Sequence, residues 1–159
     1  MVHWLWDEVW LRPGVAIFII YLFVYWAYQI FIAVRGVWSP SPLSPAKSFR
    51  RFAILIPAHN EEKVIGNLLE SLMKQNYPKY YFDIYVSCDN CHDRTAEVSK
   101  SYNVNVLEKH DISHNGKTGN VQWALREIPL EKYDAIAMFD ADNLADKNFL
   151  TKMNDYLES

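Results

Sequence analysis

The chain has 159 residues, is 50% hydrophobic, and carries 16 basic against 19 acidic side chains, for a formal net charge of −3 at pH 7. This charge balance, without any basic stripe, argues against a nucleic-acid-binding protein. The length leaves room for one small hydrophobic core beyond the strongly apolar N-terminal part.

Much of the apolar excess lies in residues 15–34, which contain no charged side chain and have Gln29 as their one side-chain amide. About twenty apolar residues in a helix cross a bilayer core of about 30 Å, so this stretch is predicted to span a membrane. Its apolar core is too long for a cleaved signal peptide, and no small-residue cleavage site follows. A buried helix of a soluble protein is the alternative. Residues 1–14 are expected to lie in the outer membrane interface as a short amphipathic segment.

The flanking charges predict the orientation of this helix. Arg12 is the one basic residue before it, whereas Arg35, Lys47, Arg50 and Arg51 follow. Because cytoplasmic flanks carry the excess of Lys and Arg, we expect a single-pass protein of the cell membrane with its C-terminal part in the cytoplasm. Residues 35–50 are rich in proline and predict an extended linker. Residues 51–159 then form one domain.

In this domain, short apolar runs alternate with stretches whose apolar residues recur at helical spacing. We predict strands at residues 52–56, 82–87, 104–107 and 135–139, and helices at residues 64–73, 95–102, about 117–127 and 147–157. Strands that alternate with helices imply right-handed crossovers and a mainly parallel sheet, so the fold class is α/β. The run at 135–139 is continuous and apolar, which indicates an interior strand.

Two carboxylates, Asp140 and Asp142, follow the last predicted strand. Side chains two residues apart in an extended chain share a face. Open α/β sheets bind their ligands outside the carboxyl ends of the strands. The pair therefore suits Mg²⁺ or Mn²⁺ held jointly with a substrate diphosphate. The alternative is a capped turn that starts the next helix.

Polar residues also follow the first two strands. His59 and Glu61 come after the first, and Asp89 comes after the second. The Asp89 carboxylate can accept the imide N–H of uracil, and the glycine-flanked Lys117 offers a positive charge to a diphosphate. Alternatively, Glu61 favours a helix N-terminus and Asp89 caps a helix.

Four stretches of the domain resemble the glycosyltransferase family 2 enzymes, which have the GT-A fold: IPAHNEE at 56–62, CDNCHDRTA at 88–96, GKTGN at 116–120 and DADN at 140–143. They follow the family's order and approximate spacing. With the N-terminal apolar helix, the chain resembles the membrane-bound branch of cellulose, hyaluronan and poly-N-acetylglucosamine synthases. The resemblance implies a membrane-anchored enzyme that uses a UDP-sugar for inverting transfer of a hexosyl or N-acetylhexosaminyl group. It also implies contact with membrane lipid.

The resemblance also implies a role for each matching residue. Ala58, His59 and Glu61 would line the nucleoside pocket, and Asp89 would contact the uracil. Lys117 would lie near the diphosphate, and Asp140 would reach the nucleotide. Asp140 and Asp142 would bind a Mg²⁺ or Mn²⁺ ion.

Two motifs of the resembling synthases do not occur here: an acidic catalytic base, typically in E-D, and Q-x-x-R-W. The catalytic base is therefore expected beyond Ser159, and the GT-A domain is expected to be incomplete. We expect the chain alone to bind donor without transferring sugar, and to self-associate through an uncovered sheet edge. The alternative is a non-catalytic, membrane-anchored nucleotide-sugar-binding protein or partner subunit.

Cys88, Cys91 and His92 match the c-type haem attachment pattern. That chemistry usually needs an exported chain, whereas the predicted topology makes this segment cytoplasmic. The same cysteines with His110 and His114 imitate a zinc site. However, the interval between Cys91 and His110 exceeds the usual one of roughly 12–15 residues.

Overall fold

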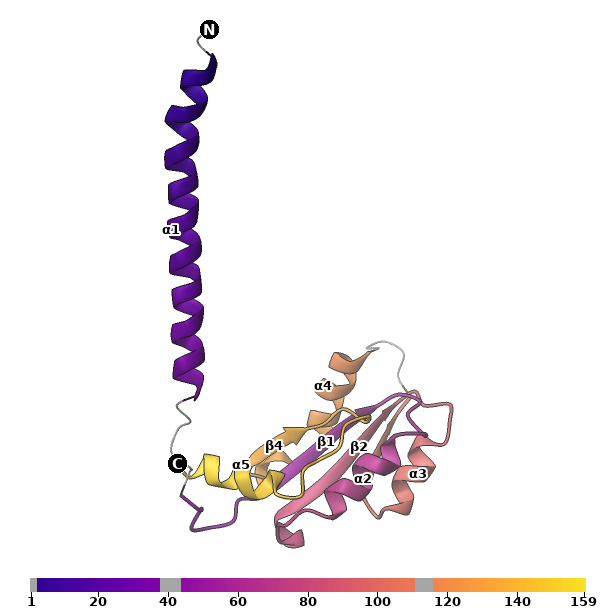
Figure 1. The fold of residues 1–159 in the computed structure, drawn as a ribbon. Coiled ribbons are helices and arrows are strands. Elements are labelled where there is room, and N and C mark those ends of the chain that lie inside the picture. The colour runs from indigo at the N-terminus through magenta and orange to yellow at the C-terminus, as the bar shows by residue number, and fades with distance from the viewer. Residues whose placement is uncertain (1–2, 38–43, 111–115) are drawn as a thin grey trace. The chain divides into compact units, whose positions relative to one another are not determined.

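The computed structural model describes residues 3–37, 44–110 and 116–159 (Figure 1). The chain divides into two compact units, Met1–Pro42 and Leu43–Ser159, and each is described by itself.

The first unit is the helix α1 (His3–Val37), which runs through Pro13 without ending there. Within Pro13–Gly36, an 18-residue window has a mean hydropathy of 2.1, and none of that window is buried inside the structure. By length and composition this helix is a candidate membrane span. The described part of the predicted interfacial segment, residues 3–14, belongs to the same helix, while residues 1 and 2 lie outside the described residues.

The second unit contains a four-stranded sheet with the order β3-β2-β1-β4, in which every pair of neighbours is parallel. The strands are β1 (Phe52–Ala58), β2 (Phe82–Asp89), β3 (Asn105–Lys109) and β4 (Ala135–Met138). This confirms the predicted α/β class. Because the strands are parallel, all their carboxyl ends meet at one edge of the sheet.

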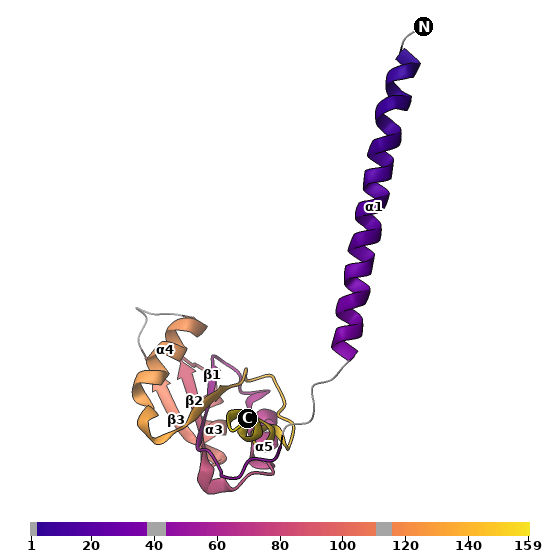
Figure 2. The same ribbon diagram turned by 90° about the vertical axis from the view of Figure 1, so that its left-hand side faces the viewer.

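Helices cover both faces of the sheet (Figures 1 and 2). One face packs against α2 (Ile65–Met73), α3 (Thr95–Ser101) and α5 (Phe149–Leu157), and the other against α4 (Lys117–Glu127). Two 3₁₀ turns, Lys79–Tyr81 and Leu130–Lys132, precede β2 and β4. The sheet is therefore the middle layer of three, as the alternation of elements predicts.

The core is built around β1, all seven residues of which are buried. Ile54 and Ile56 face α2, whereas Ala53 and Leu55 face α4. On α2, the apolar residues at helical spacing are fully buried: Ile65, Leu68, Leu69 and Leu72. Burial of each such side chain contributes about 1.5–3 kcal/mol, so this layer supplies much of the stability of the domain.

The prediction of an interior strand at 135–139 is wrong for the part of the chain that the structure describes. β4 lies at one edge of the sheet, where it pairs with β1 alone. Ile136 is 43% exposed and Met138 54% exposed, because α4 packs over β1, β2 and β3 on that face. A continuous apolar run fits an edge strand as well as a central one, so the sequence pattern could not distinguish them.

Residues 44–50, assigned above to the linker, are held by the last helix. Asn154 of α5 accepts the Arg50 N–H at 2.9 Å and donates to the carbonyl of Ser48 at 2.8 Å. Asp155 accepts the N–H of Ala46 at 2.7 Å. We call these contacts the clasp. The clasp makes this part of the predicted linker a structured border of the domain, while residues 38–43 lie outside the described residues.

Candidate functional site

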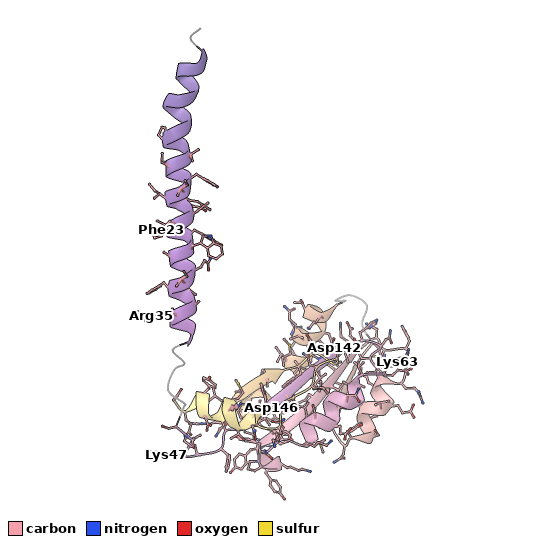
Figure 3. All side chains as sticks on the ribbon, in the orientation of Figure 1. Phe23, Arg35, Lys47, Lys63, Asp142 and Asp146 are labelled. Atoms are coloured by element: carbon pink, nitrogen blue, oxygen red, sulfur yellow. The ribbon has the colours of Figure 1, made fainter. Side chains whose placement is uncertain are left out.

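A cavity of about 860 Å³ opens at the carboxyl edge of the sheet. Its lining comes from the ends of β1 and β2 with the loops that follow them, the start of α4 and the segment after β4: Pro57, Ala58, His59, Glu61, Asp89, Asn90, His92, Gly116, Lys117, Asn120, Asp140, Ala141 and Asp142. Figure 3 labels Asp142 near this edge and Asp146 further along the same segment, closer to α5. The volume is within the usual range for a small-molecule site.

All of the site residues predicted from the sequence line this one cavity: Ala58, His59, Glu61, Asp89, Lys117, Asp140 and Asp142. They come from four separate segments of the chain, and the parallel sheet brings those segments together. The predicted convergence is therefore confirmed, while the role of each residue stays a prediction.

The loops after β1 and β2, which line the cavity, are bonded to each other. His59 Nδ1 lies 2.5 Å from the carbonyl oxygen of Asp89, and the His92 N–H donates to Asn60 Oδ1 at 2.9 Å. Asn60 and Asn90 have positive φ angles of 56° and 48°. Asparagine tolerates this left-handed conformation better than most residues, so both loops can turn sharply without glycine.

Asp93 has a structural role at the start of α3. Its Oδ1 accepts the N–H and the hydroxyl of Thr95, at 3.0 and 2.6 Å, and its Oδ2 accepts the N–H of Glu62 at 3.1 Å. Burial raises the pKa of Asp93, but the bonds from Thr95 and Glu62 outweigh it, so the net pKa lies below the ordinary value. Asp93 thus bonds to Thr95, the first residue of α3.

Asp89 is not a helix cap. Its side chain is 8% exposed, and its Oδ1 accepts Lys109 Nζ at 3.1 Å and Asn90 Nδ2 at 2.9 Å. The Lys109 side chain is 2% exposed, so this is a buried ion pair, of which Asp89 lines the cavity. Sequence reasoning missed Lys109. The available signal was its place two residues after the predicted third strand, where the other strands also carry polar residues.

Lys117 and Asp140, which both line the cavity, form an ion pair. Lys117 Nζ donates to Asp140 Oδ1, and both side chains are about half exposed, at 56% and 50%. Lys117 is the first residue of α4, whereas Asp140 follows β4. A diphosphate that enters here would meet an exposed ammonium group whose partner is a second candidate ligand residue.

The start of α4 also borders the cavity. Gly116, with φ at 91°, precedes the helix, and Asn120 in its first turns is buried. The Asn120 side chain accepts the Ser87 hydroxyl at 2.5 Å and donates to the Ser87 carbonyl at 2.9 Å, which fixes α4 to β2. The N-terminus of a helix favours anions, so α4 adds to the positive potential around Lys117.

Asp140 and Asp142 do not cap the following helix. α5 begins at Phe149, and the side chains that accept backbone N–H groups near its start are Asp146, from Asn148 at 2.9 Å, and Gln75, from Leu150 at 3.1 Å. The Asn143 N–H donates to the carbonyl of Asp140 at 3.0 Å, so the two carboxylates lie on a tight turn. The capped-turn alternative therefore does not account for them.

The two carboxylates fit a divalent cation that a ligand helps to bind. Within residues 3–37, 44–110 and 116–159, no group of three or more His, Cys, Asp or Glu side chains could hold a metal ion. Mg²⁺ and similar ions are commonly held by one or two carboxylates together with substrate phosphates. Asp140 and Asp142 provide that number of hard oxygen ligands beside a cavity large enough for a diphosphate.

The cysteine pair is part of the fold. Cys88 is buried in the core, and Cys91 Sγ lies 3.5 Å from the Asn60 nitrogen and 3.7 Å from the Ala58 oxygen. Hydrogen bonding from the Cys88 thiol, against the effect of burial, lowers the pKa of Cys91 to about 6. A buried Cys88 does not suit haem attachment. Of the residues in the zinc alternative, His114 lies outside the described residues.

Comparison with known proteins agrees with this geometry. The family model described as "Glycosyltransferase like family 2" matches residues 50–159. The chain is 32% identical over 107 residues to the probable glycosyltransferase YdaM of Bacillus subtilis, an alignment that covers 64% of this chain and 25% of that protein. It is 36% identical over 95 residues to the beta-monoglucosyldiacylglycerol synthase of Trichormus variabilis, covering 57% of this chain and 20% of that protein. The chain thus spans a quarter or less of these relatives.

Solved structures show the same likeness. Staphylococcus aureus TarS in complex with UDP matches at 26% identity with a TM-score of 0.58, over 67% of this chain and 32% of that one. The mannosyltransferase PcManGT from Pyrobaculum calidifontis, in complex with GDP-Man and Mn²⁺, matches at 20% identity with a TM-score of 0.68, over 96% of this chain and 44% of that one. At that identity the second match supports the fold alone.

Proposed function

Since this chain belongs to the glycosyltransferase-like family 2, we propose that its cavity binds a UDP-sugar donor together with Mg²⁺ or Mn²⁺, for inverting transfer of the sugar. The observation that carries the proposal is the convergence of the predicted site residues on one cavity. The likeness to TarS, which has been crystallised with UDP and with UDP-GlcNAc, supports the choice of nucleotide.

The base of the nucleotide would bind between the loops after β1 and β2. Ala58, His59 and Glu61 line one side of this part of the cavity, and Asp89 lines the other. A carboxylate is an acceptor-only group, so Asp89 can accept the imide N–H of uracil. The bonds between the two loops keep both walls in place without a ligand, which lowers the entropy cost of binding.

The diphosphate would bind between Lys117 and the two carboxylates. Lys117 would then exchange Asp140 for a phosphate oxygen, which frees Asp140 to join Asp142 as a metal ligand. A bound Mg²⁺ or Mn²⁺ ion would stabilise negative charge on the leaving diphosphate. The start of α4 adds its backbone N–H groups on the same side.

Transfer to an acceptor requires a base that removes the acceptor's proton. We assign no residue of this chain to that step. Transfer of a hexosyl or N-acetylhexosaminyl group is thus proposed for the whole protein, and the chain alone is predicted to be inactive. We also propose that α1 anchors the protein in the cell membrane, with the domain in the cytoplasm and lipid around the helix.

The test is calorimetry with the full chain in detergent micelles, titrated with UDP in the presence of Mn²⁺ and again with a chelator. We expect UDP binding that requires the metal and that Asp142→Asn greatly weakens. Asp146→Asn is the matched control, because Asp146 lies on the same segment but outside the cavity. Equal UDP affinity with and without metal would contradict the role of Asp140 and Asp142.

A further inference from the structure

We propose that Lys109 is a positioning residue that fixes the orientation of the Asp89 carboxylate and thereby makes the nucleotide site select uridine. This inference rests on the proposed function, in which Asp89 receives the base. It adds a residue that does not line the cavity and assigns the choice of base to an ion pair.

The sheet dictates where the two residues meet. Asp89 ends β2 and Lys109 ends β3, and the two are register partners in this parallel pair. Their side chains therefore point to the same face of the sheet, and Nζ lies 3.1 Å from Oδ1. The backbone reinforces this arrangement, since the Asn90 N–H donates to the carbonyl of Lys109 at 2.8 Å.

Burial makes this pair different from the other ion pairs of the domain. The Lys109 and Asp89 side chains are 2% and 8% exposed, whereas Lys117 and Asp140 are about half exposed. Burial of a charged group is costly unless an opposite charge lies beside it, and Lys109 lies beside Asp89. Because its side chain is almost fully covered, Lys109 acts through Asp89, whereas Lys117 is available to a ligand directly.

The hydrogen bonds on Asp89 are unequal between its two oxygens. Oδ1 accepts both Lys109 Nζ and Asn90 Nδ2, at 3.1 and 2.9 Å. Among the described residues no donor contacts Oδ2, and Asp89 lines the cavity. Two donors on one oxygen hold the plane of the carboxylate, which leaves Oδ2 as the acceptor presented to a ligand.

This arrangement distinguishes uracil from cytosine. Uracil carries an N–H at ring position 3, which can donate to Oδ2 in a charge-assisted bond. Cytosine carries a lone pair at that position, which faces a fixed carboxylate oxygen without a proton between them. A site that leaves a buried polar group unpaired rejects the wrong ligand strongly, so the anchored Asp89 would favour UDP over CDP.

The experiment compares UDP with CDP on the full chain in micelles at a fixed Mn²⁺ concentration. The two ligands share ribose and diphosphate, so the ratio of their dissociation constants isolates the base. We expect the unmodified protein to prefer UDP by about tenfold or more, as one charge-assisted hydrogen bond allows. Lys109→Met should remove most of that preference while metal-dependent binding of both diphosphates persists.

Two further variants make the result decisive. Lys100→Met is the matched control, since Lys100 pairs with Glu108 next to Lys109 but is 60% exposed, and it should leave the ratio unchanged. Asn90→Gly removes the other donor to Oδ1 and suits the positive φ of 48°, so it should lower the ratio in part. If Lys109→Met does not fold, as judged by circular dichroism, Asn90→Gly carries the test.

A folded Lys109→Met with an unchanged ratio would overturn this inference, as would an unchanged ratio in Asn90→Gly when the first variant is unfolded. Equal affinity of the unmodified protein for UDP and CDP would also overturn it, while leaving metal-dependent nucleotide binding intact. Failure of the unmodified protein to bind UDP at all would overturn the proposed function itself.

Discussion

Asp89 faces the cavity on one side and neutralises a buried lysine on the other. Any substitution here therefore affects folding and binding together. An alanine variant of Asp89 is therefore expected to lose both stability and UDP affinity.

We predict that Asp89→Ala lowers the free energy of unfolding by about 3–5 kcal/mol, because it leaves the charge of Lys109 buried without this partner. UDP affinity should fall as well. Urea denaturation measures the first effect and calorimetry the second. The double variant Asp89→Ala/Lys109→Met should recover stability but not UDP affinity. An unchanged unfolding midpoint in Asp89→Ala would mean that the ion pair contributes little.

At the scale of elements, Asn154 joins α5 to the segment before β1. It is 3% exposed and bonds to the Arg50 N–H, the Ser48 carbonyl and the Tyr77 hydroxyl. The same hydroxyl also donates to the carbonyl of Arg50 at 2.7 Å. One side chain thus satisfies polar groups from two other segments inside the core.

We predict that Asn154→Ala lowers the free energy of unfolding by about 2–4 kcal/mol, since each buried polar group left unpaired costs about 1–3 kcal/mol. Chemical denaturation followed by circular dichroism measures the change. Asn148→Ala is a suitable control, because its bond to Asn76 is exposed and its loss should cost much less. Equal effects of the two variants would contradict the role of the clasp.

Asp93, at the start of α3, makes the stability of the domain depend on pH. The pKa of Asp93 in the folded protein lies below its ordinary value of 3.8. A carboxylate with a lowered pKa stabilises the fold at higher pH, and that contribution disappears as the pH falls through the folded pKa. Asp93 should therefore contribute fully above about pH 5 and progressively less below about pH 4.

We predict that Asp93→Asn is less stable than the unmodified protein at pH 7, and that the difference narrows as the pH falls below 4. Urea unfolding of both proteins across this range is the measurement. A difference that stays constant with pH would show that the charge of Asp93 does not contribute.

The sequence predicted the order and approximate bounds of the strands and helices because their spacing of apolar residues is strong. On α2, for example, Leu68, Leu69 and Leu72 are all buried as expected. It also predicted the cavity residues, since parallel strands must end together. It could not predict that β4 is an edge, or that Lys109 is buried, because both depend on what packs across strands. A lysine at a strand end is ordinarily solvated, and only the register with Asp89 reveals its partner.

For the whole molecule, association with other chains concerns the edges of the described sheet, and β4 is one of these edges. Its outer side is unpaired among the described residues, and Ile136 and Met138 expose apolar surface beside it. Exposed apolar edge strands favour strand pairing between molecules. The self-association expected from the sequence would therefore use β4.

We predict that Met138→Lys raises the monomer fraction of the protein in micelles, as measured by analytical ultracentrifugation. A charge on an edge strand opposes pairing with a second copy. Leu144→Lys is the control, because Leu144 is 70% exposed but lies outside the sheet. A similar shift with both variants would show that added charge alone, and not the edge, determines association.

The clasp also has a consequence for how the domain is made on the ribosome. Arg50 and Asn154 are 104 residues apart, and Ala46 and Asp155 are 109 apart. At a synthesis rate of about 5–20 residues per second, roughly 5 to 20 seconds pass between the emergence of β1 and that of α5. During that interval the most buried strand of the domain lacks the cover that α5 provides. The nascent chain should accordingly be more exposed to chaperones and misassembly before α5 emerges than after it.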